Sequence, residues 1–88
     1  MILAVEFSKK ALKFLEKSET PVAKRLFNAI TEIKNNPFPV DVKRVENQWF
    51  ENEKVFRIRV GDYRILYSIN YQKNRLMVVN IDKRSRIY

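Results

Sequence analysis

Arginines concentrated in the C-terminal part of the chain are the residues best suited to chemistry. Six of the eight arginines lie there, at Arg57, Arg59, Arg64, Arg75, Arg84 and Arg86. The guanidinium forms forked hydrogen bonds to phosphate oxygens and keeps its charge. Residues 54–88 hold nine basic residues against two acidic ones, whereas residues 1–53 hold nine against eight. The net charge of +8 and the isoelectric point near 10.0 favour a polyanionic partner, with nucleic acid first among the candidates.

Several common catalytic groups are missing from the sequence. The chain has no Cys and no His, which excludes a thiolate nucleophile, a disulfide, a sulfur-ligated metal and an imidazole base. The C-terminal run from Lys83 to Tyr88 adds further cations, and Tyr88 offers a ring for stacking on a base and a hydroxyl for proton transfer. The alternative interpretation of this run is a frayed terminus with no fixed position.

The N-terminal half must supply the helices that position these residues. The apolar pattern predicts a strand over 2–7, a helix over 9–17 that begins after Ser8 as N-cap, and a second helix that ends near Asn35. In the second helix, Thr20 is the expected N-cap and Pro21 the first helical residue. The residues expected to face the core are Ala11, Leu12 and Leu15 in the first helix and Val22, Leu26, Ala29, Ile30 and Ile33 in the second.

The C-terminal half reads as strands. The pattern predicts a short strand over 40–45, a hairpin of strands 55–60 and 63–69 joined by a two-residue turn, and another strand over 76–81. This order, one strand, two helices and four strands, predicts an α+β fold with the helices on one face of a mostly antiparallel sheet. We expect one domain over residues 1–88.

The hairpin turn fixes which side chains share a face. If Gly61 and Asp62 form the loop, Arg59 lies opposite Arg64, and Arg57 points to the same face as both. The other face is apolar and can receive the helices; it carries Phe56, Ile58, Val60, Tyr63, Ile65, Tyr67 and Ile69.

Two directly opposed arginines repel each other unless a negative charge lies between them. One interpretation is a phosphate site kept open at a cost in stability. The other is that each arginine pairs with a carboxylate, with Glu46, Glu51 and Glu53 as candidates, or reaches into solvent. Trp49 is similarly open to two interpretations, as a core or loop anchor or as a platform for a base.

The hairpin from Phe56 to Tyr67, with the sequence FRIRVGDYRILY, and the ending KRSRIY together resemble the RelE branch of the RelE/ParE toxin superfamily. The resemblance extends over essentially the whole chain and includes the opening strand and the helical hairpin. It implies the RelE-like fold in an archaeal or bacterial toxin of a type II toxin–antitoxin system. The activity implied is a ribosome-dependent endoribonuclease that cuts mRNA in the ribosomal A site.

The resemblance also implies a mechanism and a set of residues. The 2′-OH of the RNA attacks the adjacent phosphate without a metal or other cofactor, which leaves a 2′,3′-cyclic phosphate and a 5′-OH. The family's catalytic positions fall on Arg57, Arg59, Arg64, Arg84 and Tyr88, and further RNA contacts are expected from Arg86, Lys83 and Lys54. Arginine is a poor general base, so the group that accepts the 2′-OH proton is unassigned.

The partners that the resemblance implies are the ribosome with its A-site mRNA and a RelB-like antitoxin, acidic and helical, in a higher-order complex. Two other functions stay open. The ParE side of the superfamily shares the fold but poisons DNA gyrase and lacks nuclease residues, and a nonenzymatic domain would hold nucleic acid without cutting it. The longest apolar runs are too short to span a bilayer and the N-terminus lacks a signal-peptide pattern, so we expect a cytoplasmic protein with no membrane partner.

Overall fold

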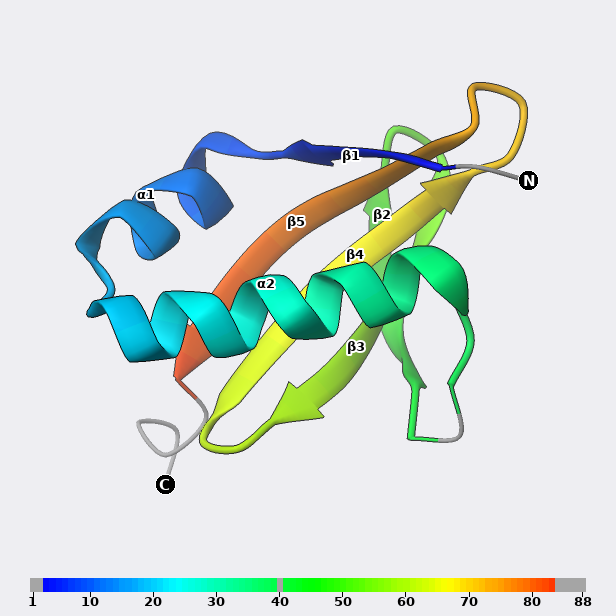
Figure 1. Cartoon of the computed structure of the whole chain (residues 1–88). Coiled ribbons are helices and arrows are strands. Elements are labelled where there is room, and N and C mark those ends of the chain that lie inside the picture. The colour runs from blue at the N-terminus through cyan, green and yellow to red at the C-terminus, as the bar shows by residue number, and fades with distance from the viewer. Residues whose placement is uncertain (1–2, 40, 84–88) are drawn as a thin grey trace.

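The computed structural model describes residues 3–39 and 41–83. Its elements are β1 (Ala4–Phe7), α1 (Lys9–Lys17), α2 (Thr20–Asn35), β2 (Lys43–Phe50), β3 (Glu53–Val60), β4 (Tyr63–Asn70) and β5 (Arg75–Lys83). The strands form one sheet in the order β1-β5-β4-β3-β2, in which β1 runs parallel to β5 and the other neighbours are antiparallel (Figure 1). The predicted α+β class and the predicted order of elements are confirmed.

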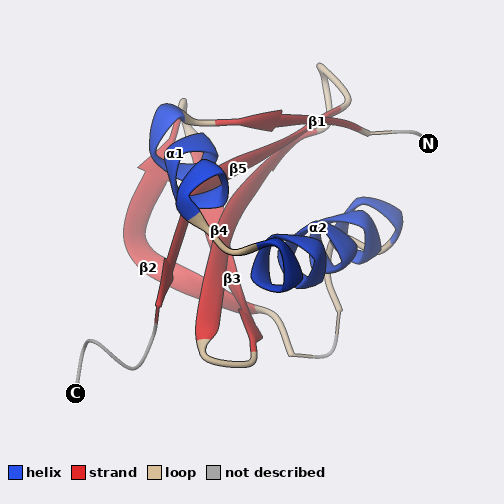
Figure 2. Ribbon diagram, turned by 60° about the vertical axis from the view of Figure 1, so that its left-hand side comes forward, coloured by secondary structure: helices blue, strands red, loops and turns tan. Residues whose placement is uncertain are grey.

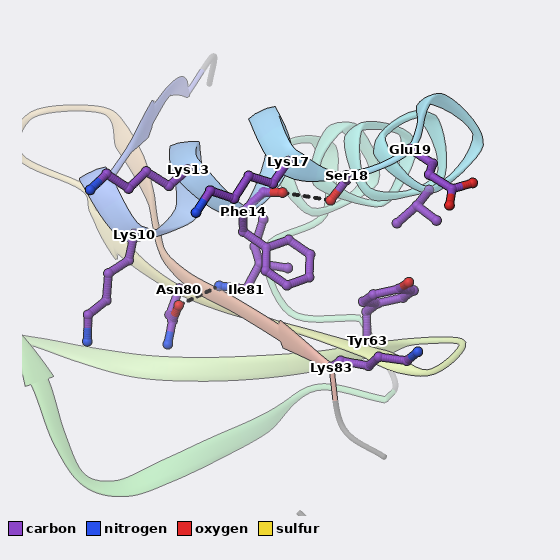
Figure 3. Close-up of a pocket in the computed structure, with 11 residues that line it drawn as sticks. Lys10, Lys13, Phe14, Lys17, Ser18, Glu19, Tyr63, Asn80, Ile81 and Lys83 are labelled. Carbon is purple, nitrogen blue, oxygen red and sulfur yellow. Dashed lines mark hydrogen bonds between the residues drawn. The ribbon is translucent and has the colours of Figure 1, made fainter. Parts of the chain in front are cut away.

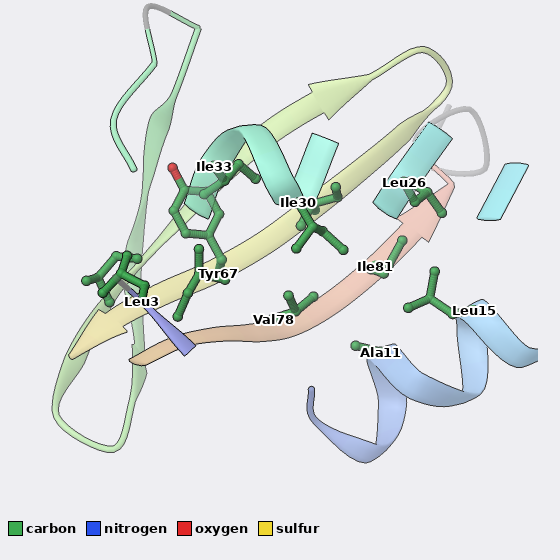
Figure 4. Packing of buried hydrophobic residues seen from close by; sticks show 12 residues of the cluster. Leu3, Ala11, Leu15, Leu26, Ile30, Ile33, Tyr67, Val78 and Ile81 are labelled. Atoms are coloured by element: carbon green, nitrogen blue, oxygen red, sulfur yellow. The ribbon is translucent and has the colours of Figure 1, made fainter. Parts of the chain in front are cut away.

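Both helices pack on the same side of the sheet (Figures 1 and 2). The core between them is built from Ala11 and Leu15 of α1, from Leu26, Ile30 and Ile33 of α2, and from Ile65, Tyr67, Ile69, Leu76, Val78 and Ile81 of the sheet (Figure 4). Removal of this apolar surface from water is the main force that holds the layers together. No helix in the described residues is both long and apolar enough to cross a membrane.

The helix boundaries follow the sequence closely, with two corrections. Ser8 caps α1 as predicted, and its hydroxyl accepts a hydrogen bond from the backbone N–H of Ala11 at 3.1 Å. In α2 the N-cap is Glu19 rather than Thr20, because Thr20 already has helical geometry. Leu12, predicted to face the core, is 46% exposed, since it projects away from the sheet while Ala11 and Leu15 are buried.

The strand predicted over residues 40–45 is wrong in its extent. β2 covers Lys43–Phe50 and carries Trp49 on a strand rather than in a loop. Its register against β3 shifts between Arg44 and Trp49, and Asn47 has a positive φ of 60°. This irregularity breaks the two-residue alternation by which a strand is recognised in a sequence, and pairing with β3 holds the segment extended in spite of it.

The hairpin of β3 and β4 has the predicted register. Val60 pairs with Tyr63 and Arg59 with Arg64 across the turn at Gly61. Gly61 adopts φ +60°, a left-handed conformation that glycine reaches without steric cost. The apolar residues expected to face the helices, from Phe56 to Ile69 in alternation, do so, and the arginines point to the opposite face together with Leu66, which pairs with Arg57.

A one-residue shift in the pairing of β4 with β5 sets the faces of β5. Leu66 pairs with Asn80 but Tyr67 pairs with Val78, which leaves Val79 as an extra residue on β5. Ser8 stabilises this bulge because its hydroxyl donates to the carbonyl of Val79 at 2.6 Å. The shift lets both Val78 and Ile81 face the core, while Asp82 turns to the other face.

Candidate functional site

The face of the sheet that points away from the helices carries a cluster of cations, here named the arginine face: Lys43, Arg57, Arg59 and Arg64. Cross-strand pairing positions them, because Lys43 pairs with Arg57 and Arg59 pairs with Arg64. Directly paired residues share a face with Cβ atoms about 5 Å apart. The structure therefore brings together Arg57, Arg59 and Arg64, three of the residues that the resemblance assigned to catalysis, and adds Lys43.

Arg64 pairs with a carboxylate that the sequence did not single out. Its Nε donates to Asp82 Oδ1 at 2.9 Å and its Nη2 donates to Asp82 Oδ2 at 3.0 Å, which is a bidentate ion pair between β4 and β5. The Arg64 side chain is 18% exposed and that of Asp82 is 38% exposed. The candidates Glu46, Glu51 and Glu53 were thus wrong for this arginine.

The other cations of the arginine face have no such partner. Among residues 3–39 and 41–83, no ion pair joins Lys43, Arg57 or Arg59 to a carboxylate. Arg57 is half-buried and Arg59 is exposed. Positive charges held together in this way attract an anion, and each arginine can donate forked hydrogen bonds to a phosphate.

Arg75 is separate from this cluster and has a structural role. Its Nη2 donates to Glu51 Oε1 at 2.7 Å, and its Nη1 lies 3.9 Å from Glu6 Oε1. The hydrogen bond to Glu51 raises the pKa of Arg75 above its already high ordinary value. The ion pair ties the turn between β2 and β3 to β5.

Two further predicted site residues, Lys54 and Lys83, are not brought together with the arginine face. Lys54 pairs with Trp49 on the helix side of the sheet, near the opposite end of β3 from Arg59. Lys83 pairs with Tyr63, which also faces the helices. The predictions for Arg84, Arg86 and Tyr88 lie outside the described residues.

Lys83 instead belongs to a second basic feature, which we name the lysine groove (Figure 3). This groove of about 630 Å³ lies between α1 and the end of β5 and is rimmed by Lys10, Lys13, Lys17 and Lys83. Phe14 and Tyr63 line it, with their rings in edge contact at 5.9 Å between centroids. The sequence signal was the spacing of the three α1 lysines, which places them along one side of a helix.

Trp49 is exposed rather than an anchor of the core. The residue is 56% exposed, and the centre of its ring lies 5.1 Å from the Arg44 guanidinium, a cation–π contact on β2. It lines a hollow of about 360 Å³ together with exposed Phe38 and Tyr71. This hollow is on the helix side of the sheet and is not continuous with the arginine face.

The sequence model of one protein family spans nearly the whole chain. The family described as ParE toxin of the type II toxin–antitoxin system parDE matches residues 5–88. The chain belongs to this family. It is a RelE-like toxin of the RelE/ParE superfamily, in agreement with the resemblance seen in the hairpin.

One sequence relative and two solved structures are similar to this chain over most of its length. RelE1 of Methanocaldococcus jannaschii is 28% identical over 87 residues, which cover 96% of this chain and 92% of that protein. A chain of the archaeal RelE–RelB complex from Pyrococcus horikoshii superposes with a TM-score of 0.79 at 24% identity and covers 98% of this chain and 99% of its own. A chain of the RelB–RelE antitoxin–toxin complex from Methanococcus jannaschii has a TM-score of 0.67 at 25% identity, with 94% of each chain covered.

Proposed function

We propose that this toxin is an endoribonuclease that enters the ribosomal A site and cuts the bound mRNA. The observation that supports this most directly is the arginine face, in which Arg57, Arg59 and Arg64 project together and only Arg64 is paired with a carboxylate in the described part of the chain. A surface of this kind can bind a phosphodiester, and it stabilises the phosphate more strongly when the negative charge on that phosphate increases.

The chemistry we propose is attack of the RNA 2′-OH on the adjacent phosphorus. The P–O bond to the 2′ oxygen forms as the 2′-OH gives up its proton, the bond to the 5′ oxygen breaks and that oxygen takes up a proton, and the products are a 2′,3′-cyclic phosphate and a 5′-OH. The pentacovalent intermediate carries more negative charge than the diester, so Arg57, Arg59 and Arg64 stabilise it more than the ground state. Arg84 remains a predicted group at the leaving oxygen and Tyr88 a predicted stacking or proton-transfer group.

The cations of the arginine face donate hydrogen bonds and do not accept a proton while charged. The rate then depends on charge stabilisation and on in-line positioning of the 2′-OH, to which the ribosome contributes by holding the codon. Free RNA should therefore be a poor substrate.

The test is cleavage on programmed ribosomes. The purified chain is incubated with ribosomes stalled on a defined mRNA, and the new 5′ ends are mapped by primer extension. We expect scission within the A-site codon that is lost in Arg64→Ala and retained in Lys24→Gln, a control that removes a cation from the exposed side of α2. Binding without scission by the folded protein would instead support a nonenzymatic nucleic-acid-binding domain.

The family description as a ParE toxin favours gyrase poisoning as the second candidate function. A gyrase poison would leave mRNA intact and inhibit DNA supercoiling. A supercoiling assay on the same preparation separates the two functions. Inhibition that survives Arg64→Ala would support gyrase as the target.

We also propose that a RelB-like antitoxin of acidic, helical character binds this toxin. The superposed relatives come from RelE–RelB complexes, and the lysine groove offers four cations around an aromatic floor. An acidic amphipathic segment matches both features, because its carboxylates meet the rim and its apolar side chains meet Phe14 and Tyr63. Reversing charge at Lys13 and Lys17 should weaken the antitoxin complex without reducing mRNA cleavage, since these lysines lie away from the arginine face.

A further inference from the structure

We propose that Asp82 is a positioning residue that presents Arg64 to an RNA phosphate. The inference rests on the proposed function, because it assumes that the arginine face binds RNA. Asp82 does not need to touch the substrate. It acts by fixing the orientation of the guanidinium that does.

The contacts of Asp82 are those of a residue that orients an arginine. Both carboxylate oxygens accept hydrogen bonds from Arg64, at 2.9 and 3.0 Å, along the edge formed by Nε and Nη2. This fixes the plane and the direction of the guanidinium and uses two of its five N–H donors. Nη1 takes no part in these two hydrogen bonds.

The pairing across the sheet explains why Arg64 needs this support. Arg59 lies directly opposite Arg64 on one side, and Asp82 lies directly opposite it on the other. Repulsion from Arg59 would otherwise turn the Arg64 side chain away from the face on which both are needed. Asp82 opposes that repulsion and lets the two arginines remain close together.

The bulge in β5 is what places Asp82 on this face. Val78 faces the core and is fully buried, and strict alternation from Val78 would send the side chain of Asp82 into the core as well. The extra residue Val79 reverses the alternation, so that Ile81 is buried and Asp82 meets Arg64. Bulges commonly redirect a side chain next to a functional site. Here the redirected side chain is the carboxylate that pairs with Arg64.

The test compares two substitutions that remove the same charge. Asp82→Asn removes the carboxylate from Arg64 and keeps its size, whereas Asp62→Asn removes an exposed carboxylate from the hairpin turn, two residues from Arg64 in sequence. Binding is measured by fluorescence anisotropy with a labelled 2′-O-methyl oligoribonucleotide, which cannot be cleaved by 2′-OH attack. General electrostatics predicts that both variants bind RNA more tightly than the wild type. If Asp82 positions Arg64, the two substitutions should change RNA affinity in opposite directions.

We expect Asp82→Asn to bind about fivefold to tenfold more weakly than the wild type and Asp62→Asn to bind at least as tightly. Asp82→Glu, which restores the carboxylate, should recover part of the affinity. Binding by Asp82→Asn that equals or exceeds that of Asp62→Asn would overturn the proposal, because the carboxylate would then only repel RNA. Thermal unfolding of each variant verifies that it is folded.

A second measurement needs no RNA. Hydrogen exchange of the Arg64 Nε–H with water is followed by NMR, and the resonance is assigned by its loss in Arg64→Lys. Exchange should be slow in the wild type and become at least about tenfold faster in Asp82→Asn. Equal exchange rates would show that Asp82 does not hold the side chain in solution and would refute the inference.

These readouts also separate this inference from the proposed function. A wild-type chain that binds the oligonucleotide but never cuts mRNA on ribosomes would refute the nuclease and leave the comparison of Asp82→Asn with Asp62→Asn intact. A wild-type chain that does not bind RNA at all would overturn both.

Discussion

Removing Arg57 should change how strongly RNA binding depends on salt, by an amount that the arginine face allows us to estimate. Each phosphate contact with single-stranded nucleic acid contributes about 0.7 to the slope of log K against log salt. If all four cations of the arginine face contact phosphate, the wild-type slope is about −2.8 and that of Arg57→Gln is about −2.1. Arg57 is the best choice because it has no carboxylate partner in the described part of the chain, so its loss leaves no unpaired anion behind.

The assay is anisotropy with the same uncleavable oligoribonucleotide in KCl between about 50 and 200 mM. Over that range the slopes correspond to about a fiftyfold loss of affinity for the wild type and about a twentyfold loss for Arg57→Gln. Lys24→Gln is the matched control, since it removes one charge from the exposed side of α2 and should leave the slope unchanged.

Two results would refute the reasoning. The first is an Arg57→Gln slope equal to that of the wild type, which would mean that RNA does not contact this face. The second is an equal decrease in Lys24→Gln, which would mean that RNA responds to the overall charge of +8 rather than to the arrangement of the arginines.

Three further changes test the fold that carries the site. Gly61→Ala should destabilise the protein by about 1–2 kcal/mol in thermal unfolding, because φ is +60° and the new Cβ would lie 2.6 Å from Arg25 Nη2 unless that flexible side chain moves. Tyr67→Phe should lower the free energy of unfolding by about 1–2 kcal/mol, because it removes a buried hydrogen bond to a backbone carbonyl. Burial raises the pKa of Tyr67, so the stability of the wild type should also fall as the pH rises above about 10. This pH-dependent loss should be absent from Tyr67→Phe. Arg59→Gln should stabilise the fold by about 0.5 kcal/mol in urea unfolding, because it removes the repulsion with Arg64 opposite, while it weakens RNA binding.

The hairpin was the part of the site that the sequence could predict. A two-residue turn at Gly61 fixes the register of everything that follows, so the opposition of Arg59 and Arg64 was already determined by counting away from the turn. The helices were predictable for a similar reason, because the Ser8 cap and the apolar spacing are local signals.

Features that depend on a break in alternation could not be predicted. The irregularity at Asn47 breaks the alternating pattern of β2, so the predicted strand ended at residue 45 and did not include Trp49. Val79 interrupts β5, and without knowledge of that bulge the alternating pattern assigns Asp82 to the core side rather than to Arg64. Both irregularities are determined by pairing with the neighbouring strand, and this tertiary contact cannot be read from the local sequence.

The arginine face combines the two arrangements that the sequence left open, arginines paired with carboxylates and arginines left unneutralised for a phosphate. Arg64 is paired with a carboxylate, whereas Arg57 and Arg59 have no ion pair with any residue in 3–39 or 41–83. If all three were neutralised, an RNA phosphate would have to break every pair before it could bind; if none were, repulsion would spread the side chains apart. One fixed arginine beside two unneutralised ones avoids both outcomes, because it sets the geometry while the others keep the attraction for a phosphate. On this reasoning the carboxylate of Asp82 should matter for RNA binding as much as the cations around it.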